Sequence, residues 1–553
     1  MWPLIAAFSL LSSTIVQALP HTNSTHHLPK ELKWRPCNLP FPKSLKDQIT
    51  VPIDCATLKV PLDYTKPKLG KTLDIQLVKV HATKEPRKGS VIFNPGGPKS
   101  SGVEEVVVKG PKYVETLGGQ FDVIGFDPRG TGHTMPYICN MAAAQENKTE
   151  KKTRSTPASL PQDDMWNILK SKAWHDGGLL ATACHKSLKD TGHLYGTAFV
   201  ARDMLRIVDA LNEDGKLRFW GRSYSTALGQ TFAAMFPDRV GRMLLDSILL
   251  ADDYYSGYWA ATVAQTEASL DNFFTECIAA GPELCPFANF TGPDTKPKDL
   301  SAALGKVFQE LIDKPIVLPK NYPTTNIPWW QPGEIKLLEQ IKYSIFSTLY
   351  QPSSFIPLMA SISSALSREW DLWMKAGEAA PTTPSSSPEP AWNLQQHAFH
   401  GIACSDAKFR AKSPEDMYSL LQYQSSKGSF ADGFLPQVWP CAQWKMDAAE
   451  RYEGSWRNIT TSFPIMLANS PYDPVTPMAS AYDVSAGFKD SRVVVHEGHG
   501  HGIMNHPSAC TIHAIKEYFS DGKLPEHGTR CKPDKTGFEE GKVKPRWWEK
   551  LGV

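Results

Sequence analysis

The sequence lacks a long apolar run beyond its N-terminus, an excess of charge of one sign, and any C-x-x-C pair. Its 59 basic and 57 acidic residues leave a net charge of +2, which gives no reason to expect nucleic acid or an anionic membrane surface as a partner. The missing C-x-x-C pair argues against a redox motif or a zinc knuckle. No internal repeat is found, so a repeat array is not expected.

The N-terminus holds the longest apolar run, from Leu4 to Val16, and it is followed by Val16-Gln17-Ala18, which resembles a small-residue cleavage site. A membrane-spanning helix needs roughly 20 residues, and this run is shorter. Residues 1–18 are therefore predicted to be a signal peptide of a secreted, extracellular protein, although no Lys or Arg precedes the run. The carboxyl end, EKLGV, carries no retention or lipid-anchor signal.

Two further features of the sequence fit a secreted protein. The cysteine count is even, at 10, which favours disulfides over free thiols or metal ligands. Neighbouring positions in the sequence suggest the pairs Cys37–Cys55, Cys139–Cys184, Cys277–Cys285, Cys404–Cys441 and Cys510–Cys531, although ten cysteines allow many connectivities. Sequons that predict a glycosylated eukaryotic protein stand at Asn23, Asn147, Asn289 and Asn458.

A chain of 553 residues is too long for one compact core. Strand patterns between Thr50 and Ile248 alternate with helix patterns, and buried strands return in "FPIMLANS" and "SRVVVHEG". The stretch between them is aromatic and largely helical. We therefore expect an α/β fold with a mostly parallel sheet, its core formed by residues 19–250 and 451–553, and a helical cap formed by residues 251–450.

The stretch "FWGRSYSTALGQ" places Ser223 between a short buried strand and a small-residue helix. A serine on such a turn is the geometry of a nucleophile elbow, whose pattern is G-x-S-x-G. Gly221 fits this pattern, but Ser225 stands where the second glycine belongs. Taken alone the match is weak, and an ordinary N-capping serine is an equal alternative.

Two late strands supply partners for this serine in the chain order Ser, Asp, His. Asp473 follows "PIMLANS", and His501 follows "RVVVHEG". Asp473 could instead form a turn before Pro474, and His499 is the second candidate for the base. A metal site at these histidines is disfavoured, because "HEGH" is one residue short of the H-E-x-x-H spacing and glycines oppose a helix.

Backbone N–H groups are needed to stabilise the oxyanion of an acyl-transfer reaction. Tyr224, directly after the serine, and Gly97, in the early loop "NPGGP", are the expected donors. Four features thus follow predicted strands in the order of an α/β-hydrolase, with no metal or organic cofactor implied. Asp127 and Arg129 in "FDPRGTG" are interpreted as a structural brace of a turn.

Several stretches resemble a known family. "NPGGPKSSG", "GFDPRGTG", "GRSYSTALGQTFAAMFPDRV" and "PYDPVTP" are similar to those of the secreted tripeptidyl aminopeptidase-like α/β-hydrolases, relatives of prolyl aminopeptidases, and the chain looks like a fungal-type member. The resemblance implies Ser223 as nucleophile, Asp473 as triad acid and His501 as triad base. The sequence departs from the family at Lys99 and Ser225, where the family usually has glycine, so substrate choice follows less securely than chemistry.

These observations predict a serine exopeptidase, of aminopeptidase or tripeptidyl aminopeptidase type, that acts on short peptides under its cap. The alternatives are a carboxylesterase, lipase-like or pathway-specific hydrolase with the same triad, and a binding protein on an inactive scaffold, which the intact Ser, Asp and His oppose. A peptide ammonium under a cap needs an acid to meet it. Asp406 is the favoured candidate, ahead of Asp252 and Asp253, with a surface role as its alternative.

Overall fold

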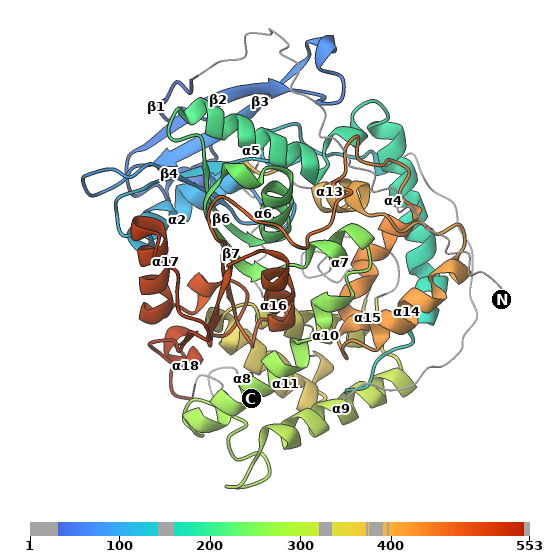
Figure 1. Cartoon of the computed structure of the whole chain (residues 1–553). Coiled ribbons are helices and arrows are strands. Elements are labelled where there is room, and N and C mark those ends of the chain that lie inside the picture. Colours follow the sequence, from blue (N-terminus) through green and yellow to red (C-terminus); the bar gives the residue numbers. More distant parts are fainter. Residues whose placement is uncertain are drawn as a thin grey trace, which may run out of the picture.

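The structure is a computed structural model that describes residues 31–141, 160–319, 335–371, 374, 391–394 and 397–546 (Figure 1). The predicted signal peptide and the sequons at Asn23 and Asn147 lie outside these residues. Asn289 and Asn458 lie within them and are exposed. In the described part of the chain, no helix combines the length and the apolar character that crossing a membrane requires.

A single 10-stranded sheet runs through the molecule in the order β1-β2-β3-β5-β4-β6-β7-β8-β9-β10. β1 to β3 are antiparallel, β3 pairs antiparallel with β5, and every pairing from β5 to β10 is parallel. The strands are β1 (Arg35–Pro36), β2 (Ile53–Pro61), β3 (Thr72–Val80), β4 (Ser90–Asn94), β5 (Asp122–Phe126), β6 (Leu217–Ser223), β7 (Val240–Ile248), β8 (Met466–Asn469), β9 (Arg492–His496) and β10 (Arg530–Cys531).

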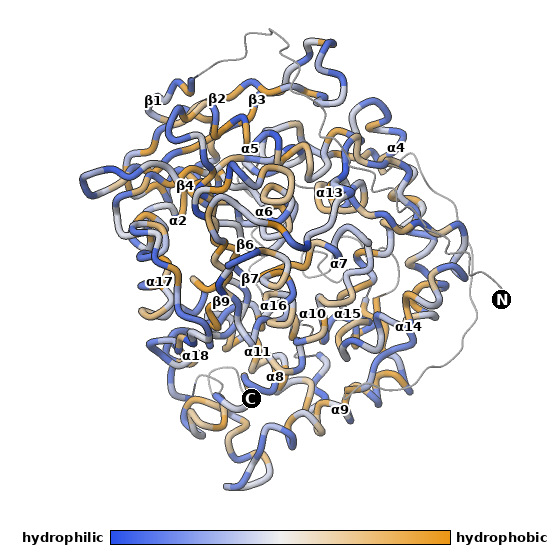
Figure 2. Tube along the Cα trace, in the orientation of Figure 1, coloured by the Kyte–Doolittle hydropathy of each residue, from blue (hydrophilic) through white to orange (hydrophobic). Residues whose placement is uncertain are grey.

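Helices cover both faces of the parallel strands, which is why β4, β5 and β8 are buried along their whole length and β7 at all but one position. Alternate residues face opposite ways, so Val91 and Phe93 of β4 pack under one layer while Ile92 packs under the other. Figure 2 shows the hydrophobic stretch of β4 inside the molecule. The first layer holds α2 (Gly102–Thr116) and α17 (Ala509–Asp521); the second holds α5 (Thr197–Leu211), α6 (Tyr224–Met235) and α16 (Met478–Gly487).

The chain leaves the sheet after β7 and returns at β8, and the residues between form the helical cap seen below and to the right in Figure 1. The expected fold class is confirmed. The cap elements are α7 (Ala251–Ser256), η6 (Ala260–Val263), α8 (Thr266–Ala280), α9 (Pro297–Asp313), α10 (Leu337–Thr348), α11 (Phe355–Ser367), α13 (Ala398–Asp406), α14 (Tyr418–Ser425), α15 (Ala431–Phe434) and η10 (Leu435–Gln443).

A second excursion, between β5 and α5, packs on this cap. It carries α3 (Met165–Ile168) and α4 (Trp174–Ser187). Trp166 lies edge-on to Tyr418 of α14 at 5.3 Å between ring centroids. A Cβ built on Gly177 of α4 would lie 3.2 Å from the Cα of Pro440. The helical layer therefore draws on two separate parts of the chain, where the sequence suggested one.

Five disulfides join the cysteines in the pairs that sequence proximity suggested. Cys277–Cys285 and Cys404–Cys441 lie within the cap, and Cys139–Cys184 lies in the second excursion. Cys37–Cys55 and Cys510–Cys531 lie at the two opposite edges of the sheet.

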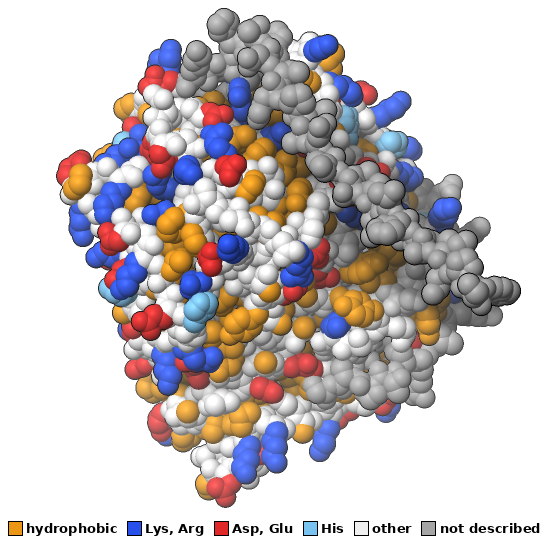
Figure 3. Space-filling model, viewed as in Figure 1, with side chains coloured by type: hydrophobic (Ala, Val, Ile, Leu, Met, Phe, Trp, Pro, Cys, Tyr) orange, Lys and Arg blue, Asp and Glu red, His pale blue; other side chains and the backbone are white. Residues whose placement is uncertain are grey.

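Charges of both signs are mixed over the visible surface (Figure 3), in keeping with the small net charge of +2.

Candidate active site

Ser223 stands at the junction between β6 and α6, as its pattern predicted. Its backbone has φ 60° and ψ −127°, a conformation that residues with a side chain adopt rarely and that marks strained functional turns. The turn is also crowded, because a Cβ built on Gly96 would lie 2.4 Å from the Arg222 carbonyl oxygen and 2.9 Å from the Tyr224 nitrogen. Only glycine lets the loop after β4 approach the serine this closely.

Ser225, which replaces the second glycine of the elbow pattern, has a role in this contact. Its hydroxyl donates to the Asn94 side-chain oxygen, and the same oxygen accepts from the Gly96 N–H at 3.1 Å. The serine therefore links the start of α6 to the loop after β4. Gly97, on that loop, and Tyr224 line the same pocket as Ser223.

Asp473 and His501, which follow β8 and β9, are in contact. His501 Nδ1 lies 2.9 Å from Asp473 Oδ2, with 8% of the histidine and none of the aspartate side chain exposed. Asp473 also accepts from the backbone N–H groups of Val475 and Thr476, each at 2.9 Å, and from the Thr476 hydroxyl at 2.6 Å. These donors hold the carboxylate toward the imidazole.

The loop that carries His501 is held against the serine strand and its neighbour. Gly502 N–H donates to the Ser247 hydroxyl at 2.8 Å, and a Cβ on Gly502 would lie 2.8 Å from Arg222 Cδ, one residue before Ser223. On the cap side, the His501 N–H donates to the Tyr350 carbonyl at 2.8 Å. Core and cap thus hold the backbone of this histidine between them.

The other histidines of the cluster face elsewhere. His499 Nε2 lies 2.7 Å from the Asn272 side-chain nitrogen and 3.0 Å from Glu276, both on α8. His496 Nδ1 lies 2.9 Å from the Thr511 hydroxyl, and burial lowers the pKa of His496 to about 4. Among the residues that the structure describes, no group of three or more His, Cys, Asp and Glu could hold a metal ion.

Asp127 and Arg129 each make buried structural contacts, with different partners. Asp127 accepts from the Val103 N–H at 3.2 Å and from the Trp392 indole N–H at 2.9 Å. Arg129 is fully buried and pairs with Asp203 at 2.6 Å, while its remaining N–H groups bond backbone carbonyls. Both arrangements match the structural interpretation made from the sequence.

Asp406 lies behind the elbow and does not line the pocket at Ser223. Its buried carboxylate accepts from the Thr197 N–H at 3.1 Å and from the Tyr254 hydroxyl at 2.8 Å, and burial raises its pKa to about 6. The expected position, facing the serine, is therefore corrected: these donors turn the carboxylate toward α5 and α7. Asp253 accepts from the N–H groups of Ala260 and Ala261, and Asp252 pairs with Arg457 at 3.8 Å.

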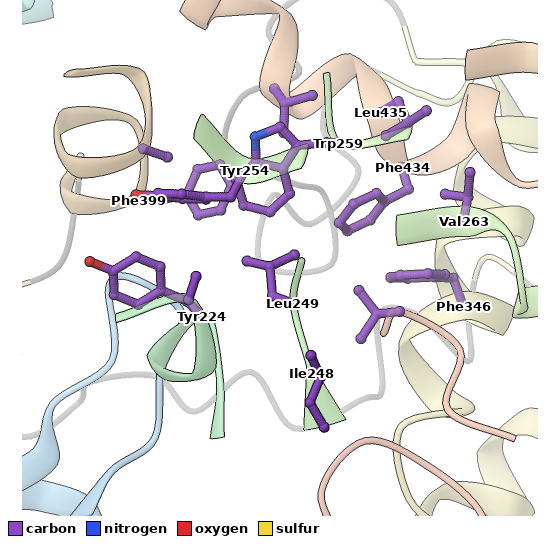
Figure 4. Packing of buried hydrophobic residues seen from close by; sticks show 14 of the residues in the cluster. Tyr224, Ile248, Leu249, Tyr254, Trp259, Val263, Phe346, Phe399, Phe434 and Leu435 are labelled. Atoms are coloured by element: carbon purple, nitrogen blue, oxygen red, sulfur yellow. The ribbon is translucent and has the colours of Figure 1, made fainter. Parts of the chain in front are cut away.

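A cavity of about 350 Å³ opens over Ser223 between core and cap. Figure 4 shows Tyr224 and Leu249 of the core facing aromatic residues of the cap. The described lining residues include Lys99 and no Asp or Glu. The aromatic members from the cap are Trp259, Tyr343, Phe346, Tyr350, Phe399 and Phe434.

Family models match two parts of this chain. The model described as "alpha/beta hydrolase fold" matches residues 89–281, which include the loop after β4, Ser223 and the start of the cap. The model described as "TAP-like protein" matches residues 427–531, which include Asp473 and His501. This chain is a serine hydrolase with the α/β-hydrolase fold.

Relatives of this hydrolase match it nearly end to end. "Tripeptidyl aminopeptidase" of Streptomyces lividans is 25% identical over 88% of this chain and 84% of its own length. "Serine protease Hip1" of Mycobacterium tuberculosis is 25% identical over 91% of each chain. "Carboxylesterase B" of the same species is 25% identical over 87% of this chain and 86% of its own length.

Among the site residues that the sequence interpretation missed are two that contact Asp473 or His501. Thr476 contacts Asp473 and lies 3.3 Å from His501 Nδ1 through its hydroxyl. The run "DPVT" carried a signal for it, since an aspartate readily accepts from N–H groups two and three residues onward. Tyr350, whose ring lies 5.1 Å from that of His501, comes from the cap, and no pattern links so distant a segment to His501.

Proposed function

We propose that this serine hydrolase is an exopeptidase that cleaves short peptides with Ser223, His501 and Asp473. The observation that carries the proposal is the 2.9 Å contact between His501 and Asp473 on a loop fastened beside Arg222 and Ser247, at the nucleophile elbow. Two relatives, a tripeptidyl aminopeptidase and a serine protease, support peptides as the substrate class.

In the proposed reaction, the Ser223 hydroxyl attacks the peptide carbonyl while His501 Nε2 accepts its proton. Asp473 holds the Nδ1–H of the imidazole and stabilises the imidazolium that forms. The N–H groups of Tyr224 and Gly97 stabilise the oxyanion, and loss of one such donor typically costs ~100- to 1000-fold in kcat. His501 then protonates the leaving amine, and water hydrolyses the acyl-enzyme by the same steps.

The cap supports an exopeptidase over an endopeptidase. Aromatic side chains of α10, α13 and α15 close the cavity above Ser223, and a volume of about 350 Å³ admits only a few residues. The five disulfides and the exposed sequons at Asn289 and Asn458 support a secreted, glycosylated eukaryotic enzyme.

The test uses a fluorophosphonate probe and a panel of aminoacyl, dipeptidyl and tripeptidyl arylamides beside p-nitrophenyl esters. The parent should be labelled and should cleave arylamides, and Ser223→Ala should lose both. Ser44→Ala, which changes an exposed serine of α1 (Lys43–Lys46), is the matched control and should keep both. Persistent labelling of Ser223→Ala would place the nucleophile elsewhere.

A carboxylesterase is the second candidate, because the described pocket lining is aromatic and holds no carboxylate to meet a peptide ammonium. The aminopeptidase form of the proposal is tested by comparing arylamides with free and acetylated N-termini. Acetylation should sharply reduce kcat/KM if an ammonium is recognised. Equal cleavage of both, together with faster cleavage of esters, would reject the aminopeptidase and favour the esterase.

A further inference from the structure

Lys99 brings a positive charge to the wall of the pocket at Ser223. It stands on the loop after β4, two residues beyond Gly97, so the two Cα atoms lie at most about 7 Å apart. Its backbone is fixed from the cap, since its carbonyl accepts from the Asn393 amide at 3.0 Å. Lys99 lines the same cavity as Ser223 and Tyr224.

No carboxylate neutralises this charge within the described residues, where the Lys99 ammonium takes part in no ion pair and no side-chain hydrogen bond. Burial alone lowers the pKa of Lys99. His400, which interacts electrostatically with Lys99, adds no second positive charge near pH 7, because burial lowers the pKa of His400 to about 3.

The rest of the described pocket wall is apolar, aromatic or uncharged. A half-buried cation with no partner is poorly solvated and gains most from an anion that enters with it. A planar carboxylate is the anion that a peptide or ester substrate carries most often. A plain surface lysine would show the same sequence, but it would not stand in the wall of the cavity that holds the reactive serine.

We propose that Lys99 binds a carboxylate of the substrate, so that this pocket selects acidic substrates over neutral ones. This inference rests on the function proposed above and specifies its substrate class. The carboxylate can come from an acidic side chain in the acyl part or from the C-terminus of a short leaving peptide. In either case the closeness of Lys99 to Gly97 places it within one or two residues of the carbonyl that is attacked.

The test compares substrates that differ by one charge. One arm sets an Ala-Ala-Glu arylamide against the Ala-Ala-Gln arylamide, and the other sets tetra-alanine with a free C-terminus against its C-terminal amide. The parent should favour the carboxylate member of one pair by about 10-fold or more in kcat/KM, the usual strength of a charge-assisted hydrogen bond. The arm that shows the preference identifies the source of the carboxylate.

Variants of Lys99 test whether this residue causes the preference for the carboxylate substrate. Lys99→Met should bring the ratio of the two kcat/KM values to about one, and Lys99→Arg should retain it. Lys298→Met, on the exposed surface of α9, is the matched control and should retain the parent ratio. Equal rates within both pairs in the parent, or a preference that survives in Lys99→Met, would overturn the proposal.

Binding measurements on inactive variants test the role of Lys99 independently of catalysis. The four peptides are titrated calorimetrically into Ser223→Ala and into Ser223→Ala/Lys99→Met, neither of which needs to turn over. If a carboxylate member binds more tightly than its neutral partner to Ser223→Ala but not to Ser223→Ala/Lys99→Met, the role of Lys99 is supported, whether or not the arylamides are cleaved. Failure to cleave any arylamide would reject only the exopeptidase. Equal binding of both members to Ser223→Ala would reject the role of Lys99 and leave the proposed exopeptidase intact.

Discussion

At the scale of single residues, the Asp473 carboxylate is the most heavily bonded group near the elbow. It accepts hydrogen bonds from two backbone N–H groups, from the Thr476 hydroxyl and from His501 Nδ1. A carboxylate fixed by several donors cannot rotate away from an imidazole. It favours the Nδ1–H tautomer, which in the proposed reaction leaves Nε2 to accept the serine proton. Thr476 therefore acts as a positioning residue for the proposed triad.

Thr476→Val tests this positioning. The valine keeps the shape of the side chain and the backbone N–H but removes the hydroxyl 2.6 Å from Asp473 Oδ2. A hydrogen bond to a charged group contributes about 1.5–3 kcal/mol, so we expect kcat/KM to fall about 10- to 100-fold. Thr476→Ser should restore most of the activity, since it restores the donor. Full activity of the valine variant would show that the hydroxyl does not position Asp473.

Asp406→Asn tests the buried carboxyl behind the elbow. Its pKa of about 6 in the folded state lies above the ordinary value of about 4, so the folded state holds a proton that the unfolded chain has lost between these pH values. Its contribution to the free energy of unfolding is thus present below pH 4 and is lost as pH rises through 6, by about 3 kcal/mol at most.

The measurement is thermal unfolding between pH 4 and pH 8. Asp406→Asn should flatten the fall in stability from pH 4 to pH 6, because the amide keeps an acceptor for Thr197 but does not titrate. Asp252→Asn changes an exposed carboxylate and should leave the parent slope unchanged. A slope equal to that of the parent in Asp406→Asn would assign the pH dependence to other groups, such as Asp127 and Asp253, whose pKa values are also raised to about 6.

At the scale of elements, the site consists of loops that follow the carboxyl ends of four parallel strands, β4, β6, β8 and β9. The order of Gly97, Ser223, Asp473 and His501 after these strands could be predicted, because parallel strands end at the same edge and their short loops carry recognisable residues. The place of Asp406 could not, since the orientation of α13 depends on cap contacts that no short pattern encodes. The excursion that carries α3 and α4 was missed for the same reason.

Gly500→Ala tests the loop after β9. The glycine has φ +91°, and a Cβ there would lie 2.2 Å from the Tyr350 carbonyl oxygen, so either His501 or the cap segment must shift. We expect kcat to fall at least 10-fold, because a misplacement of about 1 Å at a catalytic group costs that much or more. Gly528 supplies the matched control, with φ +80° and no atom within 4 Å of such a Cβ.

Gly528→Ala should cost about 1–2 kcal/mol of stability from backbone strain while kcat stays at the parent value. The comparison therefore separates strain from displacement of His501. An equal kcat in the two variants would mean that contact with Tyr350 does not set the position of the imidazole. Steady-state kinetics on the best arylamide or ester, with chemical unfolding of the same preparations, provide both readouts.

At the scale of the whole molecule, one buried ion pair joins the two excursions that make the helical layer. Lys342 of α10 is fully buried, lies 2.7 Å from Asp432 of α15, and donates to the Pro161 carbonyl of the other excursion at 2.8 Å. Asp432 in turn accepts from the Asp163 N–H at 2.7 Å. Because α10 also carries Tyr343 and Phe346 of the pocket wall, this pair connects the assembly of the cap to the cavity over Ser223.

Lys342→Met should destabilise the protein strongly, because it leaves the Asp432 carboxylate buried without its cation, a loss of about 3–5 kcal/mol. Lys342→Met/Asp432→Asn should recover more than half of that loss, since the amide removes the orphan charge and still offers an oxygen to the Asp163 N–H. Lys306→Met, exposed on α9, is the matched control and should change the free energy of unfolding by less than about 0.5 kcal/mol. Guanidinium unfolding of the four proteins decides the matter. If Lys342→Met unfolds at the parent midpoint, or if the double variant is no more stable than the single one, the two excursions are held together by their other contacts and not by this pair.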